Sequence, residues 1–215
     1  MTRILIADDH TLVRDGLKRI LAAASDLTVA GEAVDGDQAL ARVRAEEFDL
    51  VLLDLSMPGL SGVDLIKRLK LERPRLKILV LSMHGEQQYA VRAYKAGASG
   101  YLTKDSASAE LVSAIRKIAA GGVYISAAGA EQLAVGVMTR THDLPHAALS
   151  DREFQIFGLL VAGTSLTAIA DRLHLSVKTI STHKTHVLAK MNLASTAELV
   201  RYALEHKLLD GPSRS

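Results

Sequence analysis

The sequence contains no cysteine, no long apolar run and only a small excess of positive charge. Without cysteine the chain forms neither disulfide bonds nor thiolate metal sites, and it offers no cysteine nucleophile to an enzyme mechanism. A chain without disulfides is typical of proteins in a reducing compartment, so we expect a cytoplasmic location. The net charge of +2 by itself identifies no class of partner.

The apolar runs are too short for export or for membrane insertion. Residues 4–7 are apolar but are followed by two acids, so they lack the longer apolar core of a secretion signal. Residues 118–130 carry no Asp, Glu, Lys or Arg, yet this stretch contains glycines and is shorter than a membrane span. We therefore expect neither a secretion signal nor a membrane partner.

Length and composition favour two globular domains. The 215 residues are 48% hydrophobic and 23% charged, which is typical of globular rather than disordered chains. This length exceeds that of most single domains and allows each of two domains to bury its own core. Charge is unevenly distributed, because residues 172–197 contain no acid. The second half of the chain therefore contains a locally basic window.

Short apolar runs alternate with amphipathic stretches in the first half, as in repeated strand–helix units. The pattern predicts five strands, at residues 4–7, 27–33, 50–53, 78–81 and 100–102. The first, third and fourth are apolar throughout, as buried parallel strands are. Helices fill the gaps, for example at residues 12–23, 63–70 and 107–120. The predicted fold is α/β, a doubly wound, flavodoxin-like sheet of five parallel strands.

The pattern changes after the paired glycines Gly121 and Gly122. The residues that follow are small or polar and include Pro145, although residues 130–138 could form a short helix. We predict an α/β domain at residues 1–122, a linker at 123–147 and an all-α domain at 148–215.

The last part of the chain predicts helices only. Ser150 and Glu153 have the spacing of a capping box, which opens a helix that ends near Gly163. Three shorter helices follow, at residues 166–173, 177–191 and 196–205.

Polar residues stand at the ends of four predicted strands. They are Asp8 and Asp9 after the first strand, Asp54 after the third, Ser82 after the fourth and Lys104 after the fifth. Functional groups of a parallel sheet gather at the carboxyl ends of its strands, near the reversal of strand order. We therefore expect these five side chains to converge on one edge of the sheet.

These groups suit phosphoryl transfer. Three neighbouring carboxylates repel one another and need a cation, and an oxygen ligand set without His or Cys suits Mg²⁺. A metal that neutralises phosphoryl oxygens lets a carboxylate form an aspartyl-phosphate. Lys104 supplies a second positive charge, and Ser82 can donate a hydrogen bond to a phosphoryl oxygen.

The residues around this set form four characteristic segments, ILIADDH (4–10), LLDLSMPGLSG (52–62), LSMH (81–84) and AGASGYLTK (96–104). Together they resemble the receiver domain of response regulators. The resemblance implies phosphorylation of Asp54 by a sensor histidine kinase. It also implies Mg²⁺ held by Asp9, Asp54 and the carbonyl of Ser56, with Asp8 assisting through water. By the same resemblance, Ser82 would move towards the phosphoryl group and Tyr101 would turn inward. These movements would bias a two-state surface formed by the fourth and fifth helices and the fifth strand.

Other classes fit the first half less well. A magnesium phosphatase of the haloacid dehalogenase type needs a second acid two residues after the nucleophile, where this chain has Ser56. A nucleotide-binding module needs a phosphate cradle after the first strand, where Asp8 and Asp9 would repel phosphate. A third alternative is a regulator that binds DNA constitutively. His10 and His84 lie near the same edge and are interpreted as peripheral residues that tune phosphoryl exchange.

The second half contains two helices joined by a tight turn, at residues 166–173 and 177–191, the geometry of a DNA-reading unit. The second helix carries lysines, histidines and hydroxyls but no acid, which suits phosphates and base edges. Its apolar residues recur at helical spacing and should form the core contact: Ile180, Val187, Leu188 and Met191.

The segments LSDRE (149–153), IADRL (169–173), LS (175–176) and KTIS (178–181) resemble the LuxR-type helix-turn-helix of response regulators. The resemblance implies a transcriptional regulator rather than an enzyme. By the same resemblance Ser181, Thr182 and Thr185 would face base edges of double-stranded DNA, and Lys178, Thr179 and Lys184 would contact phosphates. Such domains commonly dimerise through the final helix and read paired half-sites, which implies a homodimer on DNA. His186 and His206 are expected to be surface residues.

Overall fold

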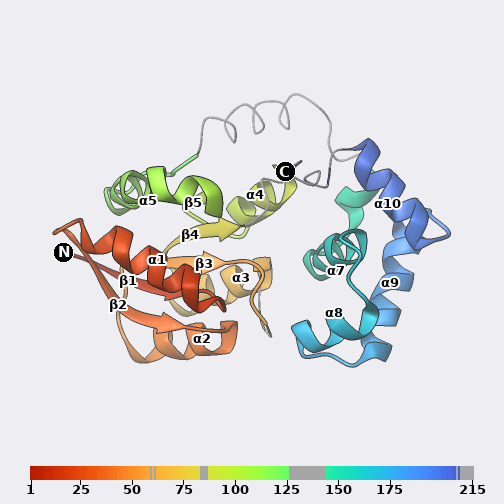
Figure 1. Cartoon of the computed structure of the whole chain (residues 1–215), viewed down its shortest axis with the longest axis horizontal. Helices are drawn as coiled ribbons and strands as arrows, with labels where there is room; N and C mark the ends of the chain where they lie inside the picture. Colours follow the sequence, from red (N-terminus) through yellow and green to blue (C-terminus); the bar gives the residue numbers. More distant parts are fainter. Residues whose placement is uncertain (59, 61, 83–86, 126–143, 207, 209–215) are drawn as a thin grey trace. The chain divides into compact units, whose positions relative to one another are not determined.

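The computed structural model describes residues 1–58, 60, 62–82, 87–125, 144–206 and 208. The chain divides into two compact units, Met1–Ala130 and Glu131–Ser215 (Figure 1). Among the described residues no helix has the length and apolarity needed to cross a membrane.

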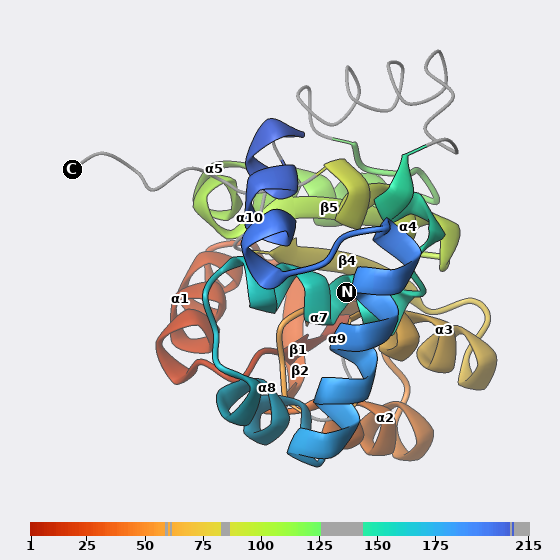
Figure 2. The ribbon, with the colours of Figure 1, turned by 90° about the vertical axis from the view of Figure 1, so that its right-hand side faces the viewer.

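The first unit is a five-stranded parallel sheet with helices on both faces (Figures 1 and 2). Its strand order is β2-β1-β3-β4-β5. The strands are β1 (Thr2–Ala7), β2 (Leu27–Ala33), β3 (Leu50–Asp54), β4 (Lys77–Ser82) and β5 (Gly100–Thr103). The helices are α1 (Thr11–Ala22), α2 (Gly36–Ala45), α3 (Gly62–Glu72), α4 (Gln87–Lys95) and α5 (Lys104–Ala119). The predicted fold class and all five strands are confirmed.

Alternation along each strand explains why both faces of the sheet are covered. Successive strand residues point to opposite faces, so a strand that is apolar throughout buries both. Leu5 and Ala7 pack in a cluster with α2 and α3, whereas Ile4 and Ile6 pack in a second cluster with α1 and α5. The sheet is therefore fixed between two apolar layers, which leaves its strand ends as the places where polar groups can gather.

Residues just after α5 also pack on the first unit, although we assigned them to the linker. The backbone N–H of Tyr124 donates to the carbonyl of Ser99 at 2.9 Å, and Tyr124 forms a parallel bridge with Gly100. The hydroxyl of Tyr94 on α4 donates to the carbonyl of Tyr124 at 2.7 Å. The predicted helix at residues 130–138 lies outside the described residues.

The second unit contains the 3-10 helix η2 (Pro145–Ala148) and four α-helices, α7 (Asp151–Val161), α8 (Leu166–Leu173), α9 (Val177–Met191) and α10 (Thr196–Glu205). Each α-helix starts after a serine whose hydroxyl accepts a hydrogen bond from the backbone N–H three residues on: Ser150, Ser165, Ser176 and Ser195. Such caps satisfy N–H groups that have no partner inside the helix. The predicted helices and the capping box are confirmed.

The contacts of η2 attach it to this unit. His146 is buried, and its Nδ1 lies 2.6 Å from the hydroxyl of Tyr202 on α10. The ring of His206 stacks against Tyr202 with centroids 4.2 Å apart, while its side chain stays exposed. His186 is exposed as expected.

Glu153 joins two helices of the second unit. Its carboxylate accepts from the backbone N–H of Ser150 at 2.7 Å and from Nζ of Lys190 on α9 at 2.6 Å. Burial by itself raises the pKa of Glu153, but the bonds from Lys190 and Ser150 outweigh it, so the pKa is lowered. The ionised carboxylate therefore stabilises the contact between α7 and α9.

We predict that Glu153→Gln lowers the free energy of unfolding of this unit by about 1–3 kcal/mol at neutral pH, since a buried charge-assisted hydrogen bond is lost. A depressed folded pKa contributes stability above the unfolded value near 4.5 and loses it as pH falls through the folded value. The difference between variant and wild type should therefore shrink in acid. Urea unfolding at several pH values measures it, with the exposed Glu205→Gln as control. An equal loss at every pH would contradict the assignment.

Candidate functional site

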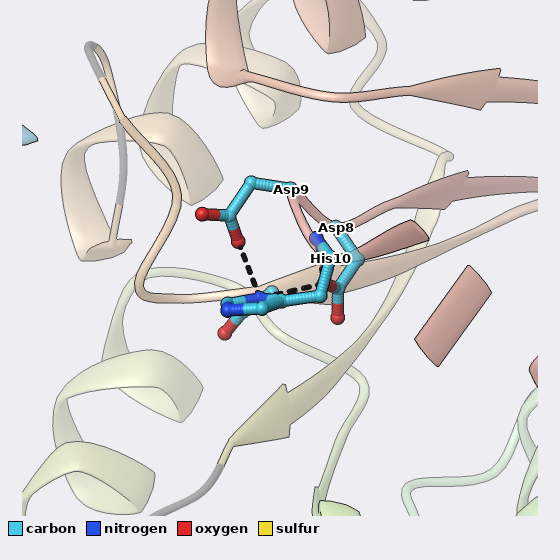
Figure 3. Close-up of side chains that lie close together, drawn as sticks. Asp8, Asp9 and His10 are labelled. Atoms are coloured by element: carbon cyan, nitrogen blue, oxygen red, sulfur yellow. Dashed lines mark hydrogen bonds and ion pairs between the residues drawn. The ribbon is translucent and has the colours of Figure 1, made fainter. Parts of the chain in front are cut away.

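Two buried carboxylates lie side by side at the carboxyl edge of the sheet. Asp8 directly follows β1 and is 1% exposed, and Asp54 ends the neighbouring strand β3 and is 2% exposed. Figure 3 shows Asp8 and Asp9 on the turn that leaves β1, with the half-buried Asp9 pointing away from Asp8. The strand order reverses between β1 and β3, so this edge is the place where parallel sheets of this type bind ligands.

Lys104 links the two carboxylates. Its Nζ lies 2.7 Å from Oδ2 of Asp8 and 3.0 Å from Oδ2 of Asp54. Lys104 is the first residue of α5, and Thr103 caps that helix, so the position of the lysine follows directly from the end of β5. Burial favours the neutral amine, but Asp54 and Asp8 outweigh it and raise the pKa of Lys104. Lys104 is therefore kept as an ammonium ion between the two carboxylates.

Asp54 is the group whose ionisation is disfavoured. Burial raises its pKa, while Lys104 and the backbone N–H of Ser56, which donates to Oδ1 at 3.0 Å, act in the opposite direction. Lys104 thus does not fully compensate the burial of the Asp54 carboxylate. A second cation beside Asp54 would restore its ionised form.

The donor set fits a divalent cation. One ligand atom each from Asp8, Asp9, His10 and Asp54 lies within 4.8 Å of the others. Oδ1 of Asp9 is buried and makes no hydrogen bond to any described residue, although Nδ1 of the exposed His10 ring lies 2.9 Å from it (Figure 3). Carboxylate oxygens around a site with excess negative charge are the ligands of Mg²⁺ and similar cations.

The remaining predicted residues of this site lie on adjacent strands. Ser82 is buried at the end of β4, where it pairs in register with Thr103. Tyr101 on β5 is also buried and packs in the apolar cluster beneath α3 and α4. The backbone of Ser56 lies at the start of the loop after β3. His84 lies outside the described residues.

Arg14 and Glu32 adjoin the site, and the pattern of the sequence did not indicate them. Nη1 of Arg14 donates to the backbone carbonyl of Asp8 at 2.8 Å, and its Nε donates to Oε2 of Glu32 on β2 at 3.1 Å. Arg14 and Glu32 are 18 positions apart in the sequence, and no local spacing rule connects residues at that separation.

Helices α8 and α9 form the helix-turn-helix. They are joined through His174, whose backbone has the left-handed conformation. Ile180, Val187 and Met191 are buried as predicted, whereas Leu188 is only half-buried. Lys178, Ser181, Thr182 and Thr185 are exposed, and their spacing of three and four residues places them on one face of α9. Thr179 and Lys184 are half-buried at its sides. The hydroxyls of Thr182 and Thr185 donate to backbone carbonyls of their own helix, so they present acceptors to a ligand.

Two known families match the two units. Residues 4–116 match the response regulator receiver domain, and residues 147–203 match the luxR family of bacterial regulatory proteins. The response regulator GacA of Pseudomonas viridiflava is 37% identical over 211 residues, which cover 98% of this chain and 99% of GacA. The response regulator UvrY of Escherichia coli K12 is 35% identical over 216 residues, which cover 100% of this chain and 99% of UvrY.

Solved structures give the same result. RcsB from Salmonella enterica serovar Typhimurium, bound to the promoter rprA in the presence of the phosphomimetic BeF3−, is 28% identical with a TM-score of 0.68. That match covers 94% of this chain and 98% of RcsB. A LuxR-family response regulator from Aurantimonas is 35% identical with a TM-score of 0.62, and covers 65% of this chain and 99% of its own.

Proposed function

Because the chain belongs to the LuxR-family response regulators of two-component systems, with a receiver domain and a helix-turn-helix output domain, we propose that phosphorylation of Asp54 controls its binding to DNA. The phosphoryl donor is a sensor histidine kinase, and the controlled process is transcription. Members of this class are transcription regulators and not enzymes. The observation that carries the proposal is the position of Lys104, within 3.0 Å of both Asp8 and Asp54 at the switch point of the sheet.

Asp54 is the nucleophile of the proposed reaction. One of its carboxylate oxygens forms a bond to phosphorus while the bond from phosphorus to the donor's imidazole nitrogen breaks, and the electron pair leaves on that nitrogen. Lys104 lies close enough to Asp54 to stabilise a phosphoryl oxygen, and Ser82 can donate a hydrogen bond to another. Burial excludes water, which strengthens both interactions.

Asp9, Asp54 and the backbone carbonyl of Ser56 would hold Mg²⁺, with Asp8 assisting through water. Bound there, the ion neutralises the charge of the phosphoryl group and of the carboxylates. Asp8 also forms an ion pair with Lys104, which keeps the lysine beside the phosphoryl acceptor. His10 and His84 stay outside this set, as residues that tune how fast the phosphoryl group enters and leaves.

The consequence of phosphorylation is proposed to reach the output domain through α4, β5 and α5. Ser82 would move towards the phosphoryl group, and Tyr101 would change its packing in the apolar cluster. We assign residues 1–122 to the receiver domain, 123–147 to the linker and 148–215 to the output domain.

In the output domain, α9 is the proposed recognition helix. Ser181, Thr182 and Thr185 would contact base edges, and Lys178, Thr179 and Lys184 would contact phosphates on both sides. Two copies are proposed to dimerise through α10 on paired half-sites. Structures of RcsB dimers on DNA are known.

The proposal is tested by measuring the intact mass of the full chain after incubation with acetyl phosphate, with and without Mg²⁺, followed by DNA binding on the same samples. We expect one Mg²⁺-dependent phosphoryl adduct and tighter DNA binding by the modified protein. DNA binding without any adduct would instead indicate a constitutive regulator. Release of phosphate without a stable adduct would indicate a phosphatase.

A further inference from the structure

The guanidinium of Arg14 is a buried cation beside the acidic turn that leaves β1. Arg14 lies on α1, is 9% exposed, and uses each nitrogen of its fork. Nη1 donates to the Asp8 carbonyl at 2.8 Å, Nε to Glu32 at 3.1 Å and Nη2 to the hydroxyl of Thr11 at 3.2 Å. Arg14 therefore contacts the backbone of Asp8, whereas Lys104 contacts the carboxylates of Asp8 and Asp54.

The position of that carbonyl explains why such a contact matters. Asp8 is the first residue beyond β1, and its N–H still donates to Ala33 at 3.1 Å. The next residue, Asp9, lies in the turn that leads into α1, where the hydrogen bonds of the sheet no longer hold the backbone. The Asp8 carbonyl and the Asp9 N–H belong to one rigid peptide plane. A bond that orients this carbonyl therefore also orients the backbone from which the Asp9 side chain projects.

Glu32 holds Arg14 in place. A guanidinium is buried at acceptable free energy only when it is paired, and its planar fork fixes direction as well as distance. Glu32 accepts from Arg14 and also from Nζ of Lys18 at 2.9 Å, and these bonds lower the pKa of Glu32 against the opposing effect of burial. The anchor is therefore ionised at neutral pH, and it connects β2 through Arg14 to the turn after β1.

We propose that Arg14, anchored by Glu32, is a positioning residue that holds the Asp8–Asp9 peptide in the orientation needed to bind a divalent cation. This inference rests on the proposed function, since it concerns the cation that supports phosphorylation of Asp54. Arg14 does not itself touch the cation ligands' side chains, so it acts through the backbone. Residues that orient metal ligands in this indirect way commonly change metal affinity when they are replaced.

The charge of Arg14 and the geometry of its hydrogen bonds have opposite effects on cation affinity, so the two effects can be separated. A positive charge near a cation site weakens cation binding, so simple removal of Arg14 would strengthen binding by Coulomb's law. Arg14→Lys keeps the charge, but its single nitrogen cannot replace the three separate nitrogens that reach Asp8, Glu32 and Thr11. Any loss of affinity in this variant therefore reports geometry alone.

The test titrates Mg²⁺ into the full-length wild type and Arg14→Lys by calorimetry, and measures the Mg²⁺ concentration for half-maximal adduct formation from acetyl phosphate. We expect Arg14→Lys to weaken Mg²⁺ binding about tenfold, with the same shift in half-maximal concentration and with full adduct formation at saturating Mg²⁺. Lys18→Gln is the matched control, because Lys18 also pairs with Glu32 but makes no contact with Asp8 among the described residues. It should leave Mg²⁺ affinity unchanged.

Equal Mg²⁺ affinity in Arg14→Lys and wild type would overturn the inference, as would equal losses in Arg14→Lys and Lys18→Gln, which would indicate a general effect of the cluster on stability. If Arg14→Lys does not fold, Glu32→Asp decides: it keeps the negative charge but shortens the anchor without touching Asp8, and weaker Mg²⁺ binding is expected there too. A wild type that binds Mg²⁺ but forms no adduct would refute the proposed function, while the calorimetric comparison would still support or refute the role of Arg14.

Discussion

Asp54→Asn is expected to abolish the phosphoryl adduct that acetyl phosphate forms with the chain in the presence of Mg²⁺. The amide oxygen of asparagine is not a competent nucleophile towards phosphorus, while the side chain keeps the shape of aspartate. Intact mass measures the result directly. Asp64→Asn is the matched control, since Asp64 is exposed in the first turn of α3 and should leave the adduct intact. An undiminished adduct in Asp54→Asn would place the phosphoacceptor elsewhere.

The same variant should be more stable than wild type when no divalent cation is present. Burial raises the pKa of Asp54, despite the opposing effect of Lys104. A carboxyl with a raised folded pKa loses stability as pH rises above its unfolded value near 3.8, because the folded state disfavours the ionised form. At neutral pH the asparagine removes this penalty, and Lys104 keeps its ion pair with Asp8. A higher Tm without Mg²⁺ would show that loss of the adduct is not caused by unfolding.

Gly36→Ala is expected to destabilise the receiver unit strongly. Gly36 is the first residue of α2, and a Cβ there would lie 1.6 Å from the carbonyl oxygen of Leu60 and 3.1 Å from Cδ2 of Leu65. The side chain of Asp35 caps α2 by accepting from Gln38, so the start of the helix cannot easily move away. Helix propensity favours alanine by about 1 kcal/mol, but overpacking against backbone costs about 1–3 kcal/mol or more. The loss should therefore exceed the gain.

Gly16→Ala supplies the opposite case. Gly16 lies inside α1, and a Cβ there would meet nothing within 4 Å. Helix propensity then acts alone and should stabilise the same unit by about 0.5–1 kcal/mol. Thermal unfolding separates the two variants, and the transition of the receiver unit is identified as the one that Mg²⁺ is expected to shift to higher temperature. A Gly36→Ala protein as stable as Gly16→Ala would contradict the packing at Leu60.

Displacement of Leu60 in Gly36→Ala should also disturb the proposed Mg²⁺ site beside Asp54. Leu60 lies in the loop between β3 and α3, which begins beside Asp54 and carries Ser56. A shift of this loop would move the Ser56 carbonyl proposed to bind Mg²⁺. Weaker Mg²⁺ binding by Gly36→Ala than by Gly16→Ala is therefore expected.

Much of the fold follows from local pattern. Strands buried on both faces must be apolar throughout, so β1, β3 and β4 are visible as short apolar runs. The serines that precede the helices of the second unit follow from the unsatisfied N–H groups of every helix start. Topology rules also placed Asp8, Asp54 and Lys104 at one edge of the sheet, because carboxyl ends of parallel strands meet there. The ends of elements were less predictable, and α5 begins at Lys104 rather than near residue 107.

Other features required the tertiary structure. The contact of Arg14 with the Asp8 carbonyl joins a helix to a strand end through a backbone atom that is the same in every residue type. The clash of a Cβ added at Gly36 depends on Leu60, which lies in the loop between β3 and α3, far from Gly36 in the sequence. His146, which the sequence placed in a linker, is buried by Tyr202, which lies 56 residues further along the chain.

The sequence by itself determined the two classes of domain, the five strands, the helix starts and the polar residues at the strand ends, because each of these depends on neighbours along the chain or on one face of one element. Only the tertiary structure decided which of those polar groups form ion pairs, how the acidic turn is held by Arg14 and Glu32, and where a glycine cannot be replaced. These depend on contacts between residues far apart in the chain, and no spacing rule specifies them, since their distances are set only when the elements pack together.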